Sequence, residues 1–424
     1  MTDNTLASAL NQHCHCINVD RDALQESLEL RLGESGVLLR LQETHPHLLA
    51  DSPVFISPDH VAQMKAIIGA IERVVSLEVY QDLVLGWAPK IAHDDPGVHG
   101  VFFGYDFHLT NDGPRLIEIN TNAGGALLLL HVAAAQQACC DAVENFVVGR
   151  VDLAGLEQAF VEMFRNEHQV LSPGSELRRV AIVDEDPDEQ YLSPEFDMFR
   201  QMFEHHGIEA VVAGPGAFTL EGGTLYFDGK PVDLIYNRLT DFYLQSPACA
   251  TLSRAFRDGA VVITPSPRTH ALYASKRNLT VLSDAERLRS LGVDNETIVT
   301  LVNGVPRTRL VSDDNATNLW SERKGLFFKP NWGFGSRGTY KGAKLTRKTW
   351  ESILHADYIA QELIPPSERL VIRDGNEQAL KLDVRCYTYQ GEIQILGARL
   401  YRGQTTNFRT DGGGLAAVFT APEP

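Results

Sequence analysis

Residues 101–120, which read VFFGYDFHLTNDGPRLIEIN, hold oxygen-bearing side chains in an alternating pattern. The central NDGP favours a tight turn, and the period-two alternation on both sides of it is typical of two antiparallel strands. Pairing about the aspartate of this turn places Asp106 opposite Glu118 and Gly104 opposite Asn120. The pattern therefore predicts that two carboxylates and an amide share one small area of a sheet.

Oxygen ligands in this arrangement predict a magnesium site. Two carboxylates that face each other on a sheet repel unless a cation lies between them. Carboxylate and amide oxygens are the ligands that magnesium takes, so Asp106, Glu118 and Asn120 are candidate metal ligands. His108 shares their face, and the alternative interpretation is a polar sheet face exposed to water. The opposite face is predicted to enter the core, and it comprises Tyr105, Phe107, Leu109, Ile117 and Ile119.

A glycine-rich segment at 327–338, FFKPNWGFGSRG, could bind phosphate. Gly333, Gly335 and Gly338 allow backbone amides to approach an anion closely, and Lys329 would add a positive charge. The GK[ST] of nucleotide-triphosphatase loops is missing, and the following TYKGAKL reads as a strand rather than as the helix of a Rossmann turn. A plain hairpin turn is the alternative interpretation.

Charged residues also alternate near the C-terminal end of the sequence. Asp383 and Arg385 lie on one predicted strand, LDVRCYTYQ, and Arg399 lies on the next, IQILGARLY. Guanidinium groups have a fork geometry suited to the oxygens of phosphates and acyl phosphates. The alternative is that these are surface charges on a two-stranded ribbon.

Other patterns predict the elements that position these residues. A helix is expected over 57–80, and Ser57-Pro58 suits its N-cap and first turn. After LSPGS near residue 175, strand and helix patterns alternate up to Pro265, which indicates an α/β unit. From Gly325 we expect strand, glycine-rich loop and strand, then a helix over 347–355 and further strands. The predicted domains are 1–175, a helical region with the hairpin; 176–270, an α/β unit; and 271–424.

Composition restricts the class of protein. The 424 residues include 38 Lys and Arg against 55 Asp and Glu, a net charge of −17, which argues against a dedicated nucleic-acid binder. Six cysteines are too few for a disulfide scaffold, and no signal peptide begins the sequence. The apolar run at 126–135 is too short to span a membrane. We expect a soluble cytoplasmic protein, whose oligomeric state the sequence leaves open.

One further cluster, His13-Cys14-His15-Cys16, offers soft metal ligands. Consecutive residues cannot surround one ion tetrahedrally, because paired ligands normally have two to four residues between them. The alternative is a short extended segment that packs Cys14 and Cys16 inward, since both share one face of a strand.

Read in order, several motifs resemble those of the ATP-grasp ligases: GYDFHL…LIEINTNAGG, KPNWGFGSRG, DYIAQELI, DVRCYTYQGEIQILGAR and TTNFRTDGGG. In most of that superfamily the E-x-N segment follows the others, whereas here it comes first. This order resembles a circular permutation, similar to eukaryotic-type glutathione synthetases and glutathionylspermidine-synthetase-like proteins. The resemblance implies an α/β (α+β) ATP-grasp fold with an inserted pre-ATP-grasp α/β substrate domain. It also predicts that residues 57–125 complete the sheet left unfinished at 420.

The resemblance implies roles for the matching residues. Lys276, Lys329 and Asp383 would bind the nucleotide. The glycine-rich segment would cover its phosphates with Gly333, Gly335, Ser336 and Gly338. The adenine would be bound by Gln361, Glu362 and Leu363. Arg385 and Arg399, with Lys329, would be catalytic, and Asp106, Glu118 and Asn120 would bind magnesium. Asn407 and Arg409 would lie near the second substrate. In one departure from eukaryotic-type glutathione synthetases, Asn331 and Trp332 stand where a metal-binding Glu is expected.

Polar residues at the strand ends of the α/β unit are further candidates for substrate contacts. They are Asp184, Glu185, Asn237 and Arg238, and ordinary loop polarity is the alternative.

The implied activity is ATP- and Mg²⁺-dependent ligation of a small-molecule carboxylate to an amine through an acyl phosphate. No nucleic acid or membrane partner is expected. A phosphotransferase on the same scaffold and a nucleotide-binding module without turnover are the alternatives. The sequence does not identify either substrate.

Overall fold

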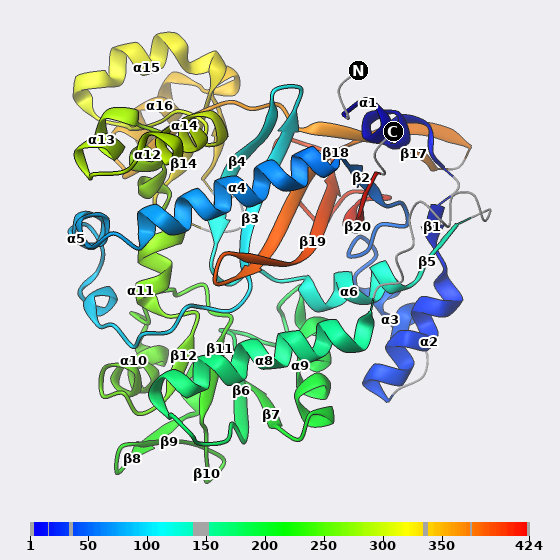
Figure 1. Ribbon diagram of the computed structural model, residues 1–424, viewed down its shortest axis with the longest axis vertical. Helices are drawn as coiled ribbons and strands as arrows, with labels where there is room; N and C mark the ends of the chain where they lie inside the picture. Colours follow the sequence, from blue (N-terminus) through cyan, green and yellow to red (C-terminus); the bar gives the residue numbers. More distant parts are fainter. Residues whose placement is uncertain are drawn as a thin grey trace.

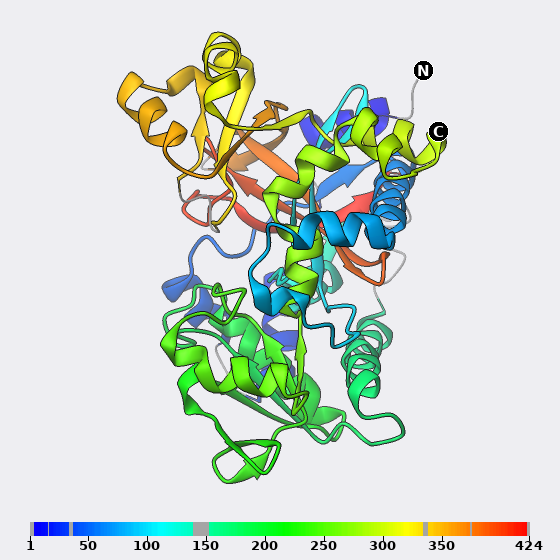
Figure 2. The ribbon, with the colours of Figure 1, turned by 90° about the vertical axis from the view of Figure 1, so that its left-hand side faces the viewer.

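The computed structural model describes residues 4–15, 17–33, 37–138, 152–333, 338–373 and 375–421. Three sheets position most of the predicted site residues and are called here the central sheet, the small antiparallel sheet and the parallel sheet. Figure 1 shows the central sheet in the middle of the molecule, with the small antiparallel sheet and its yellow helices above it and the green parallel sheet below. Figure 2 shows the same separation from the side.

The central sheet joins strands from both ends of the chain. Its order is β2 (Val54–Ile56), β20 (Gly414–Thr420), β19 (Glu392–Tyr401), β18 (Asn376–Tyr389), β3 (Phe103–Thr110) and β4 (Gly113–Asn120), and β17 (Ser367–Arg373) also pairs with β18. β3 runs antiparallel to β18, whereas β2 runs parallel to β20. The expectation that N-terminal segments complete the C-terminal part of the sheet is confirmed.

The hairpin β3–β4 has the predicted register at one end only. Asp106 pairs with Glu118 and Gly104 with Asn120, as expected. A β-bulge then shifts the register, so that Phe107 pairs with Leu116. The prediction that Ile117 enters the core was wrong, because the extra residue turns Ile117 to the other face and gives its place in the core to Leu116, which is fully buried.

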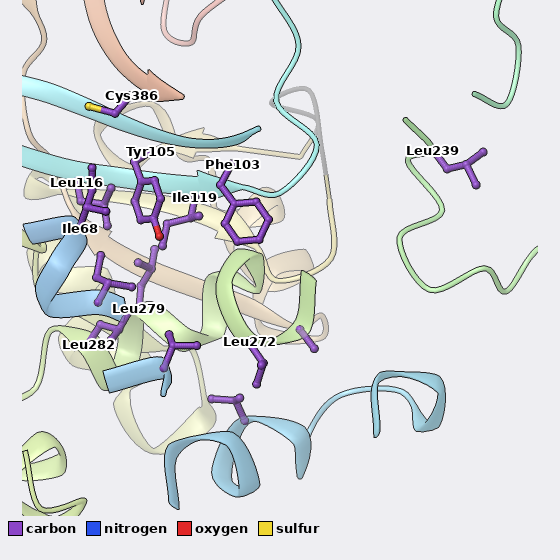
Figure 3. Packing of buried hydrophobic residues seen from close by; sticks show 14 of the residues in the cluster. Ile68, Phe103, Tyr105, Leu116, Ile119, Leu239, Leu272, Leu279, Leu282 and Cys386 are labelled. Atoms are coloured by element: carbon purple, nitrogen blue, oxygen red, sulfur yellow. The ribbon is translucent and has the colours of Figure 1, made fainter. Parts of the chain in front are cut away.

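The apolar face of this hairpin packs on helices. Figure 3 shows Tyr105, Leu116 and Ile119 facing Ile68 of the neighbouring helix α4 (Pro58–Val75). The Ser57 side chain caps α4, as its sequence predicts, by accepting from the His60 N–H. The predicted helix 57–80 is, however, two helices, since α4 ends at Val75 and α5 (Glu78–Leu85) follows a short break.

The parallel sheet occupies residues 179–264, inside the predicted α/β unit. Its order is β12 (Val262–Thr264), β11 (Leu234–Asn237), β6 (Arg179–Val183) and β7 (Glu209–Ala213), with α8 (Leu153–Leu171), α9 (Ser193–His205) and α10 (Ala250–Arg257) beside it. An antiparallel ribbon that the sequence analysis missed comprises β8 (Thr219–Glu221), β9 (Thr224–Phe227) and β10 (Lys230–Pro231). The division of the chain into three domains stays a prediction.

The small antiparallel sheet carries the glycine-rich segment. Its order is β13 (Thr308–Leu310), β16 (Tyr358–Glu362), β14 (Leu326–Pro330) and β15 (Tyr340–Lys341), and α15 (Ala316–Glu322) and α16 (Arg347–Leu354) belong to the same region. The predicted helix 347–355 is thus confirmed as α16. The helices before this sheet were not predicted, and they are α11 (Pro267–Thr269), α12 (Leu279–Leu282), α13 (Ala285–Ser290) and α14 (Asn295–Gly304).

The remaining elements lie near the N-terminal end and α6. They are α1 (Asn4–His13), β1 (Ile17–Val19), α2 (Arg21–Leu32), α3 (Val37–Thr44), α6 (Ala126–Ala134) and β5 (Gln136–Ala138). Cys14 follows α1 and is buried, while Cys16 lies outside the described residues. Within the described ranges, no three His, Cys, Asp or Glu side chains are grouped to hold a metal ion, and no helix is long and apolar enough to cross a membrane.

A fully buried arginine anchors α1 to the central sheet. Arg369 of β17 is 0% exposed, and within the described residues its guanidinium donates only to backbone carbonyl oxygens. The acceptors are Leu10, Asn11, Cys14, Pro53 and Leu370. Burial lowers the pKa of Arg369. Three of these acceptors lie at the C-terminal end of α1, where regular helical hydrogen bonding stops, although the Leu10 carbonyl still accepts from the Cys14 N–H. This one side chain therefore binds several acceptors at once.

Candidate nucleotide and magnesium site

A cavity of about 720 Å³ lies where residues of the central sheet and of the small antiparallel sheet meet. Cavities of this size are typical of small-molecule sites. Many of the predicted site residues line it: Asp106, Glu118, Asn120, Lys276, Lys329, Gly333, Gln361, Glu362, Leu363, Asp383 and Arg399. The sequence motifs therefore converge on one space, although they are separated by up to several hundred residues.

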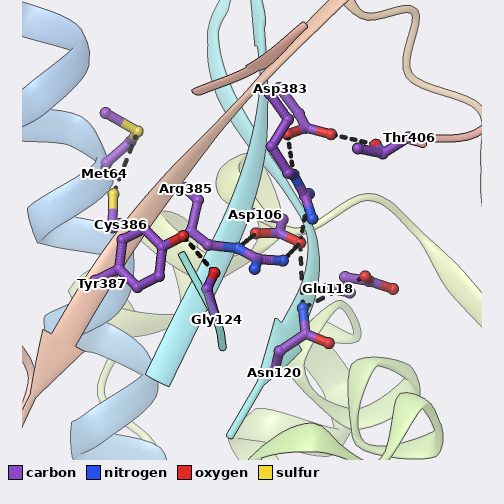
Figure 4. Close-up of polar contacts among 11 residues, drawn as sticks. Met64, Asp106, Glu118, Asn120, Gly124, Asp383, Arg385, Cys386, Tyr387 and Thr406 are labelled. Atoms are coloured by element: carbon purple, nitrogen blue, oxygen red, sulfur yellow. Dashed lines mark hydrogen bonds and ion pairs between the residues drawn. The ribbon is translucent and has the colours of Figure 1, made fainter. Parts of the chain in front are cut away.

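Asp106, which lines this cavity, is held by two arginines, of which Figure 4 labels Arg385. Arg385 binds it with two hydrogen bonds, Nε to Oδ1 at 2.6 Å and Nη2 to Oδ2 at 2.7 Å. Arg399 Nη2 lies 2.8 Å from Oδ2 of the same carboxylate, and its Nε lies 2.7 Å from Oδ1 of Asp383. Charges thus alternate from Arg385 to Asp383, and each buried charge has a partner of opposite sign.

A glycine makes room for this network. Arg385 of β18 reaches Asp106 across Gly104 of β3, and a Cβ on Gly104 would lie 3.0 Å from Arg385 Nε and 2.6 Å from the Cβ of Ala123. Arg385 is buried and does not line the cavity. Its side chain therefore holds Asp106 from behind the cavity lining, and its predicted catalytic role stays a prediction.

Unlike Asp106 and Asp383, Glu118 has no arginine bound directly to it among the described residues. Asn120 Nδ2 lies 3.4 Å from Glu118 Oε1 and 3.1 Å from Asp106 Oδ2. Desolvation disfavours the charged form of Glu118, but the nearby Lys276 and Lys329 outweigh it and hold its pKa below the usual value. Glu118 is thus an ionised carboxylate beside an amide whose oxygen faces away from it.

Two lysines face these oxygens. Lys329 Nζ donates to the carbonyl oxygen of Ile117 at 3.0 Å, and Lys276 Nζ donates to the carbonyl oxygen of Gly333 at 2.9 Å. Burial lowers the pKa of Lys329 to about 8, with Glu118 opposing and Lys276 adding to the shift. The bulge that displaces Ile117 therefore supplies the carbonyl that orients Lys329.

The end of β16 and the residues after it differ in whether their backbone N–H groups are already hydrogen-bonded. The N–H groups of Glu362 and Leu363 donate to Arg307 and Gly325 carbonyls, both at 2.9 Å. Both N–H groups are thus already paired, while Gln361, Glu362 and Leu363 all line the cavity, and their contact with an adenine stays a prediction. Among the described residues, the Ile364 N–H has no partner, and Pro365 and Pro366 have no N–H to offer.

Comparison with known proteins identifies the architecture. No protein-family profile matches the sequence, and no curated protein matches it. A glutathione synthetase-like effector from Globodera pallida is similar in structure, with a TM-score of 0.54 and 12% identity over 88% of this chain and 90% of that one. The chain has an ATP-grasp fold. This confirms the α/β ATP-grasp part of the predicted fold class, and at 12% identity the likeness is one of fold alone.

Two other solved structures are similar to smaller degrees. A putative gamma-glutamylcysteine synthetase from Methylobacillus flagellatus has a TM-score of 0.45 at 11% identity, covering 85% of this chain and 87% of that one. The ATP-grasp ligase PsnB, in a structure with a minimal precursor, Mg and ADP, has a TM-score of 0.29 at 16% identity, covering 56% and 88%.

The ATP-grasp cavity also contains residues that the sequence analysis did not select. His108 lines it, with its role left open by the sequence, and so do Glu368 and Lys381, which are paired across β17 and β18. Further members are Lys341, Lys344, Thr405 and Thr406. The alternation of Lys381 with Asp383 on one strand was a usable signal, because residues two apart point to the same face.

Asn237 and Arg238 lie outside the ATP-grasp cavity. Arg238 is buried, donates to the Ala123 carbonyl and to the Tyr236 hydroxyl, and lies 3.9 Å from Glu195. Asn237 donates to the Pro265 carbonyl at 3.0 Å. Both side chains hold neighbouring loops, so in this conformation the structure does not place them as the predicted substrate contacts.

Asn407, in the loop after β19, makes its hydrogen bonds within that loop. Asn407 Nδ2 donates to the Arg402 carbonyl at 2.7 Å, and its Oδ1 accepts from the Arg409 N–H at 3.0 Å. Thr405 and Thr406 line the cavity in place of Asn407 and Arg409. Asn407 therefore shapes the loop and does not itself face the cavity.

The glycine-rich segment is described in part. Gly333 lines the ATP-grasp cavity, whereas Gly338 has a positive φ of 68° and accepts from the Tyr358 hydroxyl at 2.8 Å. Gly335 and Ser336 lie outside the described residues.

Proposed function

We propose that this protein is an ATP- and Mg²⁺-dependent ligase that joins a carboxylate to an amine through an acyl phosphate. The observation that carries the proposal is the convergence of Lys276, Lys329 and Arg399 with Glu118 and Asn120 in one cavity of an ATP-grasp fold. Positively charged side chains bind the phosphates of a nucleotide, and carboxylate and amide oxygens bind a divalent metal ion.

The donor set fits magnesium. Glu118 is held in its ionised form, and the Asn120 amide directs its nitrogen at the two carboxylates, which leaves its oxygen for a cation. Asp106 already accepts hydrogen bonds from Arg385 and Arg399, so its oxygens would bind magnesium while they also accept from these arginines. Magnesium at this place would neutralise charge on phosphate oxygens.

The roles of the remaining residues follow from charge. Lys276, Lys329 and Arg399 would bind and orient the phosphates while a substrate carboxylate oxygen attacks the γ-phosphorus and ADP leaves. The amine nitrogen would then attack the acyl carbon, lose a proton and displace phosphate. Asp383 would hold Arg399 in place through the 2.7 Å contact with its Nε.

We also propose that the order of these motifs is a circular permutation of the usual ATP-grasp order. The pairing of β3 with β18 and of β2 with β20 supports it, because each joins an N-terminal segment to a C-terminal one. The parallel sheet of residues 179–264 would then be the substrate-side unit.

A turnover assay tests the proposal. Purified protein with MgATP should release ADP and phosphate only when an acid and an amine are both present, and a panel of acid–amine pairs locates the substrates. ADP release without any amine, with a phosphorylated acid as product, would indicate a phosphotransferase instead. Thermal stabilisation by ATP without ADP from any pair would indicate a binding module.

Nucleotide affinity should fall as the pH rises above about 8. Lys329 has a pKa lowered to about 8, so it is charged below that pH and loses its proton above it. Phosphates favour the charged form, and binding above pH 8 must therefore take up a proton. Titration calorimetry with MgADP from pH 7 to 9.5 should show weakening of up to about tenfold per pH unit past this pKa.

Lys329→Arg provides the matched control, because a guanidinium stays charged over this range. This variant should bind MgADP with little change between pH 7 and 9.5. An equal pH dependence in both proteins would assign the effect to another group.

A further inference from the structure

His108 connects the magnesium hairpin to the segment after β16. Its Nδ1 lies 2.7 Å from the carbonyl oxygen of Ile364, and the ring lines the cavity two residues beyond Asp106 on the same strand. A carbonyl oxygen can only accept, so Nδ1 carries the hydrogen. In the neutral ring, Nε2 is then a hydrogen-bond acceptor.

This second nitrogen is open to the cavity. Within the described residues, Nε2 makes no hydrogen bond, and it is not among the polar atoms that protein encloses without a partner. The contact with Ile364 fixes the ring, so the position of Nε2 is fixed as well. The cavity therefore presents a neutral acceptor at a defined point.

A neutral acceptor selects one part of a nucleotide. Phosphate oxygens are ionised at pH 8 and cannot donate to it, and they are served by Lys276 and Lys329. The nucleoside part carries the donors, which are the exocyclic amine of the base and the ribose hydroxyls. The free N–H of Ile364, on the residue whose carbonyl His108 holds, supplies a complementary donor for an acceptor atom of the nucleoside.

We propose that His108 is a specificity-determining residue for the nucleotide, whose Nδ1–H orients Ile364 and whose Nε2 accepts a hydrogen bond from the nucleoside. The inference rests on the nucleotide binding proposed above. Loss of the acceptor removes one hydrogen bond, whose net contribution corresponds to an affinity loss of about three- to tenfold.

Two variants separate the two nitrogens. His108→Asn keeps an N–H near the place of Nδ1 and removes the acceptor at Nε2, whereas His108→Gln places an amide near Nε2 and gives up the contact with Ile364. Calorimetric titration at pH 8, where an ordinary imidazole is neutral, measures the Kd of MgADP for each variant. Circular dichroism and Tm verify that both are folded.

Analogues of ADP identify the donor. They are 2′-deoxy-ADP, 3′-deoxy-ADP and the diphosphate of purine riboside, which lacks the exocyclic amine. The wild-type protein should bind the analogue without the relevant donor about three- to tenfold more weakly than ADP. His108→Asn should bind that analogue and ADP with equal affinity, because this variant lacks the acceptor that Nε2 provides. His108→Gln should still bind ADP more tightly than the analogue, because its amide lies near the place of Nε2.

The outcomes distinguish this inference from the proposed function. If the wild-type protein and His108→Asn bind MgADP equally and rank the three analogues alike, His108 has no role in specificity, and the proposed ligase site stands. If the wild-type protein binds no adenine nucleotide, the proposed function is overturned and the role of His108 with it.

Discussion

Glu118→Gln should lower the rate of ADP release by at least about a hundredfold in the presence of MgATP, acid and amine. The substitution keeps the size of the side chain and an oxygen for Asn120, but it removes the negative charge that faces Lys276 and Lys329. Magnesium then loses its ionised ligand in the proposed site, and the two lysines lose a counter-charge. A coupled assay of ADP release at saturating magnesium measures the effect.

Glu351→Gln is the control for this variant, because Glu351 is an exposed glutamate of α16, away from the cavity lining. It should retain full activity. Lys329→Ala should be as damaging as Glu118→Gln, since it removes one of the two lysines proposed to bind the phosphates. Retention of activity by either cavity variant would show that the reaction takes place elsewhere.

Arg369→Met should lower the free energy of unfolding by about 3 kcal/mol or more. Arg369 has no exposed surface and donates to carbonyl oxygens of α1, of the segment before β2 and of β17. Methionine fills similar volume but donates nothing, so several buried acceptors lose their partners at once. Removal of a buried charge offsets part of this loss, which keeps the expected effect below the sum of the individual bonds.

Urea unfolding monitored by circular dichroism measures this change, with Arg409→Met as the control at an exposed position. The control should change the free energy of unfolding by less than about 0.5 kcal/mol. A loss below about 1 kcal/mol for Arg369→Met would mean that water replaces the guanidinium at these carbonyls.

Local pattern was sufficient to predict the hairpin and the pairing of its two carboxylates, Asp106 and Glu118. The turn residues and the alternation of 101–120 set the pairing of Asp106 with Glu118, which the structure confirms. The same reasoning misplaced Ile117, because a bulge adds one residue without a distinct signal in the alternation. An inserted residue changes the face of a side chain while it leaves the strand itself in place.

Roles that depend on distant segments could not be predicted from local pattern. Arg385 is 279 residues from Asp106 in the chain, and only the register of β3 on β18 determines that their charges cancel. Arg238 is likewise occupied by contacts with Tyr236 and the Ala123 carbonyl. The sequence identified side chains suited to phosphate and metal, and tertiary pairing decided which of them reach the cavity.

Because the central sheet combines strands from the N-terminal and C-terminal parts of the chain, it can form only late in synthesis. A ribosome-bound chain that ends before β18 contains Asp106 and Glu118 but not the arginines that neutralise Asp106. Closing the loop between β3 and β18 costs chain entropy that only the completed sheet can offset. The nascent hairpin must therefore wait, with an unpaired edge and with Asp106 lacking its arginine partners, until synthesis of most of the chain is finished. This interval is when chaperones would matter most to the protein.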